Sequence, residues 1–244
     1  MMGAGKPFVI AIDGPAASGK SSLALALARR LGLTLVDSGA MYRAVTLIAL
    51  ERDVVMHNEK ALGMIAQSVS TDFRIEMPVD SPPMIMIGDR DITQEIRSVE
   101  VGDAVSEISR VGAVRNELVR LQRSMVSGRG AVVEGRDIGT AVFPDAPLKV
   151  FLQASLKERA RRRYKELKRR GVPMSRKYVT EEIARRDSID TSRGLSPMFM
   201  ASDAFLLDTT GMRVEQVVNS IMEELRARKL IVSRKRNLKG HRQA

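Results

Sequence analysis

Glycines, a lysine and two serines stand at a spacing suited to phosphate binding in the segment "IDGPAASGKSS" (residues 12–22). Gly14 and Gly19 are separated by four residues, and Lys20 and Ser21 follow directly. In this pattern, backbone N–H groups turn inward around phosphate oxygens, the lysine reaches the outer phosphates and the next hydroxyl binds magnesium. The alternative is a glycine-rich turn without a ligand. We predict a nucleotide-phosphate site with Ser21 as the metal ligand; its cradle comprises Gly14, Pro15, Ala16, Ala17, Ser18, Gly19, Lys20, Ser21 and Ser22.

The segments on either side of this loop predict a strand and a helix. Residues 8–13, "FVIAID", are apolar enough for a buried parallel strand, and residues 22–32 predict a helix closed by a glycine. A second strand over 33–39 and an amphipathic helix over 40–53 follow. Such alternation favours a parallel sheet covered by helices, with ligands beyond the carboxyl ends of the strands.

The rest of the chain continues this alternation around one irregular segment. Residues 71–93 contain prolines, β-branched residues and an apolar "MIMI" run, which predict a small antiparallel insert. Two buried strands, "AVVEG" and "LKVFLQ", flank a loop dense in charge. Helices are predicted at 97–109, 112–127, 156–170, 177–194 and 213–229, and a last strand at 204–210.

The formal charge of +11 is concentrated in two segments. Residues 226–244 hold eight Lys/Arg and no Asp/Glu, and residues 156–170 hold nine basic and two acidic residues, so the remainder is net acidic. For the terminal segment a solvated extension is the main interpretation, and an RNA or polyphosphate contact stays open. The 156–170 helix has an anionic target in the adjacent phosphate site, although a solvated face is its alternative.

Four arginines predict phosphoryl transfer instead of nucleotide binding alone. Arg43, Arg136, Arg186 and Arg193 each stand beside a carboxylate or small polar residue, as needed to orient a guanidinium, and such a reaction must neutralise the charge spread over the moving group. Neither histidine is expected to be catalytic. A phosphate acceptor is already an ionised nucleophile, so positioning replaces a general base.

The composition bears on the cellular setting. The chain has no cysteine, which excludes disulfides and cysteine-ligated metal sites, and it lacks a run of about 18 apolar residues. With no apolar signal segment at the start, we expect a cytoplasmic protein with no membrane contact.

Five segments together resemble the bacterial cytidylate kinase family: "IDGPAASGKSS", "DSGAMYRAV", "VVEGRDIGTAVFPDAPLKVFL", "RRDSIDTSR" and "ASDAFLLDTT". The resemblance spans residues 8 to about 225. It implies a three-layer α/β P-loop NTPase fold with a five-stranded parallel sheet. It also implies a kinase domain over 1–229, with a monophosphate-binding insert at about 63–100 and a helical lid at about 157–195, leaving a basic tail over 230–244.

The resemblance also implies roles for residues. Lys20 would contact the transferring phosphate, and Arg136 and Arg193 would clamp phosphate. Glu134 departs from the aspartate that many relatives carry, so its contact is left open. The remaining implied sites are Ser38, Tyr42 and Arg43 for the monophosphate, Ser106, Arg115 and Asp137 for cytosine, Arg186 and Asp190 for the acceptor sugar and neighbouring phosphate, and, more weakly, Arg159 and Arg163 for ATP.

Several of these residues keep other interpretations. Tyr42 could be a core aromatic, and Arg136 with Asp137 a structural ion pair. The expected reaction uses ATP and Mg²⁺ to phosphorylate CMP or dCMP in a monomeric enzyme. A kinase for UMP or AMP is one alternative. The other is a nucleic-acid-binding ATPase that uses the basic tail, although no nucleic acid is required for the kinase reaction.

Overall fold

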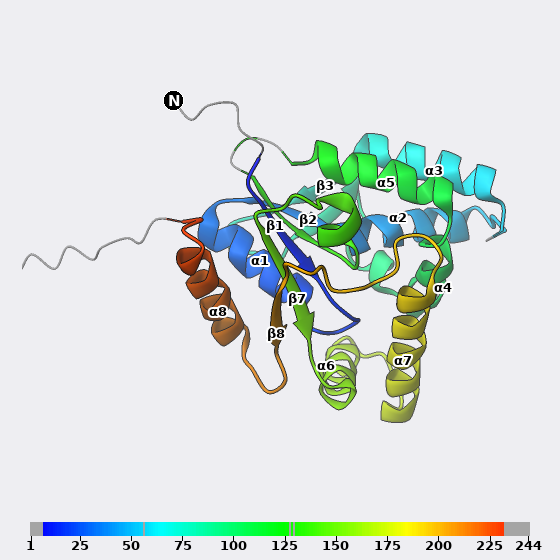
Figure 1. Ribbon diagram of the computed structural model, residues 1–244. Helices are drawn as coiled ribbons and strands as arrows, with labels where there is room; N and C mark the ends of the chain where they lie inside the picture. Colours follow the sequence, from blue (N-terminus) through cyan, green and yellow to red (C-terminus); the bar gives the residue numbers. More distant parts are fainter. Residues whose placement is uncertain (1–6, 56, 127, 129, 232–244) are drawn as a thin grey trace, which may run out of the picture.

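The computed structural model describes residues 7–55, 57–126, 128 and 130–231, and its centre is a five-stranded sheet (Figure 1). The strand order is β2-β6-β1-β7-β8, and every neighbouring pair is parallel. The predicted five-stranded parallel sheet is therefore confirmed. The strands are β1 Val9–Asp13, β2 Thr34–Asp37, β6 Ala131–Glu134, β7 Leu148–Gln153 and β8 Phe205–Asp208.

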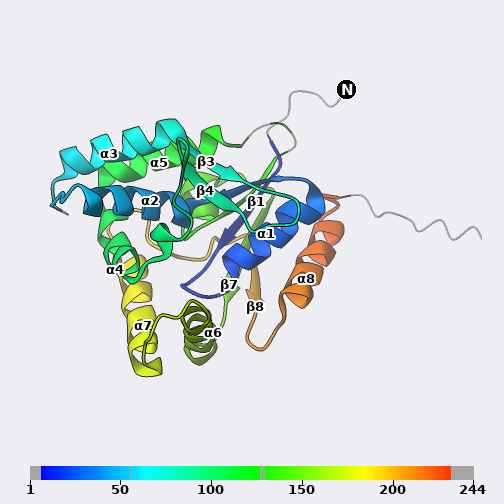
Figure 2. The same ribbon diagram turned by 180° about the vertical axis from the view of Figure 1, so that it is seen from behind.

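Helices cover both faces of this sheet and complete three layers (Figures 1 and 2). One apolar cluster joins the sheet to α1 and α8, and another joins the opposite face to α2, α3, α4 and α5. The central strand β1 is buried at every position, as expected for a parallel strand covered on both faces. The helices are α1 Lys20–Leu31, α2 Ser38–Glu51, α3 Glu59–Asp72, α4 Val99–Ile108, α5 Gly112–Ser124, α6 Leu156–Arg169, α7 Arg176–Ser192 and α8 Val214–Ala227.

A three-stranded antiparallel sheet follows α3, as predicted for residues 71–93. Its strands are β3 Phe73–Glu76, β4 Met84–Ile87 and β5 Arg90–Asp91, in the order β3-β4-β5. The hairpin of β3 and β4 reaches α1, where Arg29 donates a hydrogen bond to the carbonyl of Pro78 at 3.3 Å (Figure 2). The insert is thus attached to the core at both ends and at its tip.

Two elements were not predicted. Helix α3 begins after Asn58, whose side chain accepts from the backbone N–H of Ala61, and it buries Leu62, Ile65, Ala66 and Val69 at helical spacing. The expected start of the insert at residue 63 falls inside this helix. In the charge-dense loop, residues Ile138–Val142 form a π-helical turn. The carboxylate of Asp13 holds its start by accepting from the N–H groups of Ile138 at 2.8 Å and Gly139 at 2.7 Å.

Helices α6 and α7 pack against each other at the carboxyl ends of the strands (Figure 1). Their shared apolar cluster contains Leu167, Val179 and Ile183, and it also takes in Ala16 of the phosphate loop. These helices therefore lie directly over the predicted nucleotide site. Across the described part of the chain, the structure has no helix that is both long and apolar enough to span a membrane.

Candidate active site

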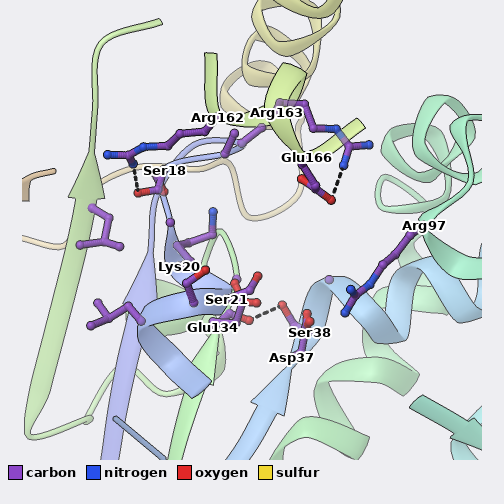
Figure 3. A pocket seen from close by; sticks show the side chains of 18 of the residues that line it. Ser18, Lys20, Ser21, Asp37, Ser38, Arg97, Glu134, Arg162, Arg163 and Glu166 are labelled. Atoms are coloured by element: carbon purple, nitrogen blue, oxygen red, sulfur yellow. Dashed lines mark hydrogen bonds and ion pairs between the residues drawn. The ribbon is translucent and has the colours of Figure 1, made fainter. Parts of the chain in front are cut away.

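A cleft of about 880 Å³ opens at the carboxyl ends of the strands, where a parallel sheet binds its ligands. Its walls come from the loop between β1 and α1, the start of α2, the antiparallel insert, and helices α6 and α7 (Figure 3). Basic side chains outnumber acidic ones among the lining residues. The cleft is therefore suited to ligands that carry several negative charges.

The phosphate loop has the conformation that its glycines predict. Gly14 has φ +143°, and a Cβ there would lie 2.1 Å from the carbonyl oxygen of Leu152 in β7, so only glycine fits. Gly19 also has positive φ, and so does Ala17, at +58°, where an L residue is uncommon. Residues 16–22 line the cleft, and Gly14 and Pro15 form the loop's entry behind it.

Lys20 lies buried at the start of α1 and points into the loop (Figure 3). Its Nζ donates to the carbonyl oxygen of Pro15 at 2.8 Å. Burial, and then the guanidinium of Arg136, lower the pKa of Lys20 to about 7. A bound polyphosphate would supply the counter-charge that favours the ammonium form.

Three oxygen-bearing side chains from different elements meet beside Lys20. Ser21 stands in the first turn of α1, Glu134 ends β6, and Asp37 ends β2. The Glu134 carboxylate faces the Ser21 hydroxyl (Figure 3), which favours its charged form. Burial, and then the neighbouring Asp37 carboxylate, raise the pKa of Glu134 to about 7. Ser38 Oγ donates to the Glu134 backbone carbonyl at 2.7 Å and fixes the start of α2 against β6.

At the opposite end of the cleft, Asp137 is held between two arginines. One of its oxygens accepts a hydrogen bond from Arg115, and the other lies 3.1 Å from Nη2 of Arg193. The Arg115 guanidinium also lies over the Tyr42 ring, 5.9 Å from its centroid. Ser106 lines the cleft nearby, and all five side chains are buried. The structure thus brings the predicted cytosine-reading residues together, and adds Arg193 to them.

Arg193 was expected to clamp phosphate, but its Nε donates to the carbonyl oxygen of Ser196 at 2.6 Å and its other end faces Asp137. It therefore stands with the residues predicted to read cytosine. Arg115 supports Asp137 from behind, since it does not line the cleft itself. Its Nη1 also donates to the backbone carbonyl of Ser109.

Arginines from three elements converge between the two ends. Arg136 follows β6 and donates from Nε to Asp190 Oδ2 at 2.7 Å, whereas Arg186 lies 3.7 Å from Glu182 within α7, and Arg43 lies 3.8 Å from Asp37. The Nε atoms of Arg43 and Arg186 are buried without a hydrogen-bond partner among the described residues. Burial lowers the pKa of Arg186, and Arg136 and Arg43 add to this effect. Buried donors without a hydrogen-bond partner are suited to an incoming phosphate.

The two arginines assigned to ATP on α6 have different surroundings. Arg163 lines the cleft and pairs with Glu166 at 2.9 Å (Figure 3). Arg159 lies behind the phosphate loop, outside the lining, where it donates to the backbone carbonyls of Ala154 and Ala16. Its guanidinium is thus committed to the protein chain.

Sequence reasoning assigned no role to five further arginines that line the cleft: Arg97, Arg161, Arg162, Arg169 and Arg213. Arg162 donates to the carbonyl oxygen of Ser18 at 3.0 Å and to the Thr209 hydroxyl at 3.1 Å, which ties α6 to the loop and to the end of β8. Arg97 extends toward the cleft from the 3₁₀ turn Glu95–Arg97 (Figure 3). Arg162 belongs to the basic run of α6, and this run could have indicated that Arg162 contacts the phosphate loop. Arg97 is a single arginine in "EIRS", and nothing in that pattern indicates a place in the cleft. The basic tail falls outside the described residues from position 232 onward.

Comparisons with known proteins agree with this geometry. The family profile described as cytidylate kinase matches residues 10–227. The cytidylate kinase of Carboxydothermus hydrogenoformans is 44% identical over 214 residues, covering 88% of this chain and 95% of that protein. Those of Pelotomaculum thermopropionicum and Azotobacter vinelandii are 45% and 44% identical and cover 89% and 92% of this chain, and 96% and 98% of their own lengths. The chain belongs to the cytidylate kinase family.

Proposed function

We propose that this enzyme transfers the γ-phosphoryl group of ATP to CMP or dCMP, giving ADP and CDP or dCDP. Family membership supports a nucleoside monophosphate kinase. The observation that carries the assignment of residues is that a phosphate loop and a buried Arg–Asp–Arg group open into the same cleft. ATP is placed on the loop and the monophosphate at the Asp137 end, with the insert and the α6–α7 lid closing over them.

The acceptor phosphate needs alignment and charge neutralisation instead of a general base. Lys20 would bind the transferring phosphate, and Arg43, Arg136 and Arg186 would surround the acceptor and moving phosphates from the opposite side. Each arginine enters from a different element, so together they can hold two polyanions in line for displacement. The buried Nε donors of Arg43 and Arg186 have no hydrogen-bond partner among the described residues, which supports this placement. Asp190 aligns Arg136 and is near enough to the acceptor side to meet a ribose hydroxyl.

The donor set beside Lys20 fits a magnesium ion. The Ser21 hydroxyl would ligate it, and the Glu134 and Asp37 carboxylates would bind it directly or through its waters. Magnesium keeps several waters and takes few protein ligands besides substrate phosphates. Because no group of three His, Cys, Asp or Glu among the described residues could hold a metal by itself, substrate phosphates and water would have to complete the coordination. When bound, the ion would shield the ATP phosphates and favour charge development on the leaving oxygen.

Base selection is assigned to Asp137. Cytosine carries an exocyclic amine that can donate to a carboxylate, whereas uracil places an oxygen acceptor there and would face the charge of Asp137. The two arginines orient Asp137, because each engages one of its oxygens. Ser106 lies on the same wall and supplies a further hydroxyl for the base edge.

The test is release of ADP from ATP and Mg²⁺ with CMP, dCMP, UMP or AMP added separately, and with no acceptor as control. We expect fast release with CMP and dCMP and little with the others. Release with UMP or AMP equal to that with CMP would contradict the assigned base. Inert acceptors together with RNA-stimulated hydrolysis would favour the nucleic-acid-dependent ATPase.

A further inference from the structure

We propose that Asp187 and Arg159 are positioning residues that couple the α6–α7 lid to the phosphate loop by holding the peptide groups of Ala16. This inference deepens the proposed function and rests on it, because it concerns how the loop that binds ATP is kept in place. Neither side chain lines the cleft, so neither is expected to touch ATP.

The three residues form a closed ring of hydrogen bonds. The backbone N–H of Ala16 donates to Asp187 Oδ1 at 3.0 Å, and the carbonyl oxygen of Ala16 accepts from Arg159 Nη1 at 3.2 Å. The same Arg159 nitrogen pairs with Asp187 Oδ2. Both backbone polar groups of one loop residue are therefore taken up by the lid, one by each of its two helices.

The ring is shielded from water on most sides. The side chain of Arg159 is 9% exposed and that of Asp187 is 18% exposed, and Ala16 is buried in the apolar cluster of α6 and α7. A second donor of Arg159, its Nε, binds the carbonyl of Ala154 at the end of β7. At this burial a charge-assisted bond holds geometry better than a surface pair does.

The loop has a reason to need such a restraint. Ala17, the next residue, has φ +58°, a conformation that L residues rarely adopt. Its neighbour Ala16 is fixed on both sides, so the turn at Ala17 cannot relax without breaking the ring. Without the ring, we expect the loop to sample other conformations and to present fewer of its N–H groups to phosphate at once.

The same helix reaches the acceptor side of the cleft. Asp187 directly follows Arg186, and one turn later Asp190 binds Arg136. A shift of α7 that moves these groups must also move Ala16 or break its bonds. The placement of the ATP loop and of the acceptor arginines is therefore linked through a single rigid element.

The experiment compares Asp187→Ala, Asp187→Asn, Arg159→Met and the Asp187→Ala/Arg159→Met double variant. Steady-state kinetics give kcat and the separate KM values for ATP and CMP, and hydrogen exchange reports the backbone amides of residues 14–19. Glu181→Gln on the same helix is the matched control. The Glu181 side chain is exposed, and its Oε1 forms a long ion pair of 3.9 Å with Lys177 Nζ. Melting temperatures verify that each variant is folded.

For Asp187→Ala we expect the KM for ATP to rise about tenfold and the KM for CMP to change less than about twofold, since misplacement of a binding group costs affinity at that group. Loop amides should exchange faster. Asp187→Asn should be milder, because its amide oxygen can still accept from Ala16. The double variant should be no worse than the poorer single variant, as expected for side chains that act as one unit.

An unchanged KM for ATP and unchanged loop exchange in folded Asp187→Ala would overturn the coupling and leave a structural ion pair. Single effects that multiply in the double variant would also overturn it. If the wild-type enzyme released no ADP with CMP, the proposed function would fail instead, and the exchange rates alone would decide whether Asp187 and Arg159 hold the loop.

Discussion

The two ends of the cleft are built to hold their ligands by different means. At the phosphate loop the chain offers backbone N–H groups, one buried lysine and hydroxyls, all within residues 14–22. At the Asp137 end, side chains of α2, α4, the β6–β7 segment and the residue after α7 line the cleft. Asp137 pairs there with Arg193 and, from behind, with Arg115 of α5. The loop is continuous in sequence, whereas the other end is assembled only by the fold.

This difference predicts how each end responds to its ligand. Within the described part of the chain, the only hydrogen bond of Lys20 Nζ is to a backbone carbonyl, so a polyphosphate adds a counter-charge in direct contact with it. Asp137 already has both oxygens engaged. The exocyclic amine of a bound cytosine would therefore share the Asp137 carboxylate with Arg115 and Arg193. Binding there would depend strongly on geometry, which favours discrimination between bases over high affinity.

Removing the charge at the loop should have the largest effect. Lys20→Met should lower kcat by about 10³-fold, because a cation aimed at the moving phosphate acts mainly in the transition state. Discrimination between CMP and UMP, measured in the same assay by the ratio of kcat/KM values, should be retained. A variant with full kcat would show that Lys20 does not contact the transferring group.

Changing the other end should affect selectivity more than turnover. Asp137→Asn should lower kcat/KM for CMP by about 10²-fold, because loss of one partner from a buried charge pair costs about 3 kcal/mol. The preference for CMP over UMP should narrow, and the KM for ATP should stay within about twofold. Asp203→Asn, an exposed partner of Lys149, is the control for a carboxylate-to-amide change. Equal loss for ATP and CMP would mean that the substitution disturbs the whole cleft.

The pH profile separates the two ends further. Lys20 carries its charge below its pKa of about 7, which burial has lowered, so raising the pH neutralises it in the free enzyme. The kcat/KM for ATP should fall by up to about tenfold per pH unit above that value. At saturating ATP, kcat should fall less, because bound phosphate favours the ammonium. In Lys20→Arg the decline should disappear; its persistence would assign the titration to another group, such as Glu134.

The smallest effect is expected from the tail. Removing residues 232–244 should change kcat/KM for CMP by less than about twofold, because the cleft is complete within the described residues before that point. RNA binding, measured by a salt-dependent mobility shift, should weaken if the tail contributes to it. A large loss of CMP phosphorylation would instead place the tail in the kinase reaction.

Most of the fold could be predicted because its signals are local. Buried parallel strands are short apolar runs, and the loop glycines mark the junction between β1 and α1. Helix α3 also carried a local signal, an asparagine cap followed by apolar residues at helical spacing. The π-helical turn was not predictable in the same way, since it depends on Asp13, more than a hundred residues earlier.

In the candidate site, too, the parts with local sequence signals were predictable and the parts formed by distant residues were not. Residue types and spacing were enough to predict the phosphate loop. The cytosine-reading residues came from a resemblance, since nothing local connects Arg115 with Asp137. The bond between Ala16 and Asp187 spans 171 positions and joins two segments with unrelated patterns. Such contacts depend on how α6 and α7 pack over the loop. The sequence around Arg159 does not reveal this packing, so Arg159 was assigned to ATP although its guanidinium binds the chain.

A competition between two acceptors tests whether Asp137 selects the acceptor base. Equal concentrations of CMP and UMP are mixed with limiting ATP and Mg²⁺, and the CDP-to-UDP ratio is read by chromatography for the wild type and for Asp137→Asn. We expect CDP almost alone from the wild type and a CDP-to-UDP ratio nearer to one from the variant. A wild-type ratio near one, or a ratio unchanged by the substitution, would contradict this role of Asp137.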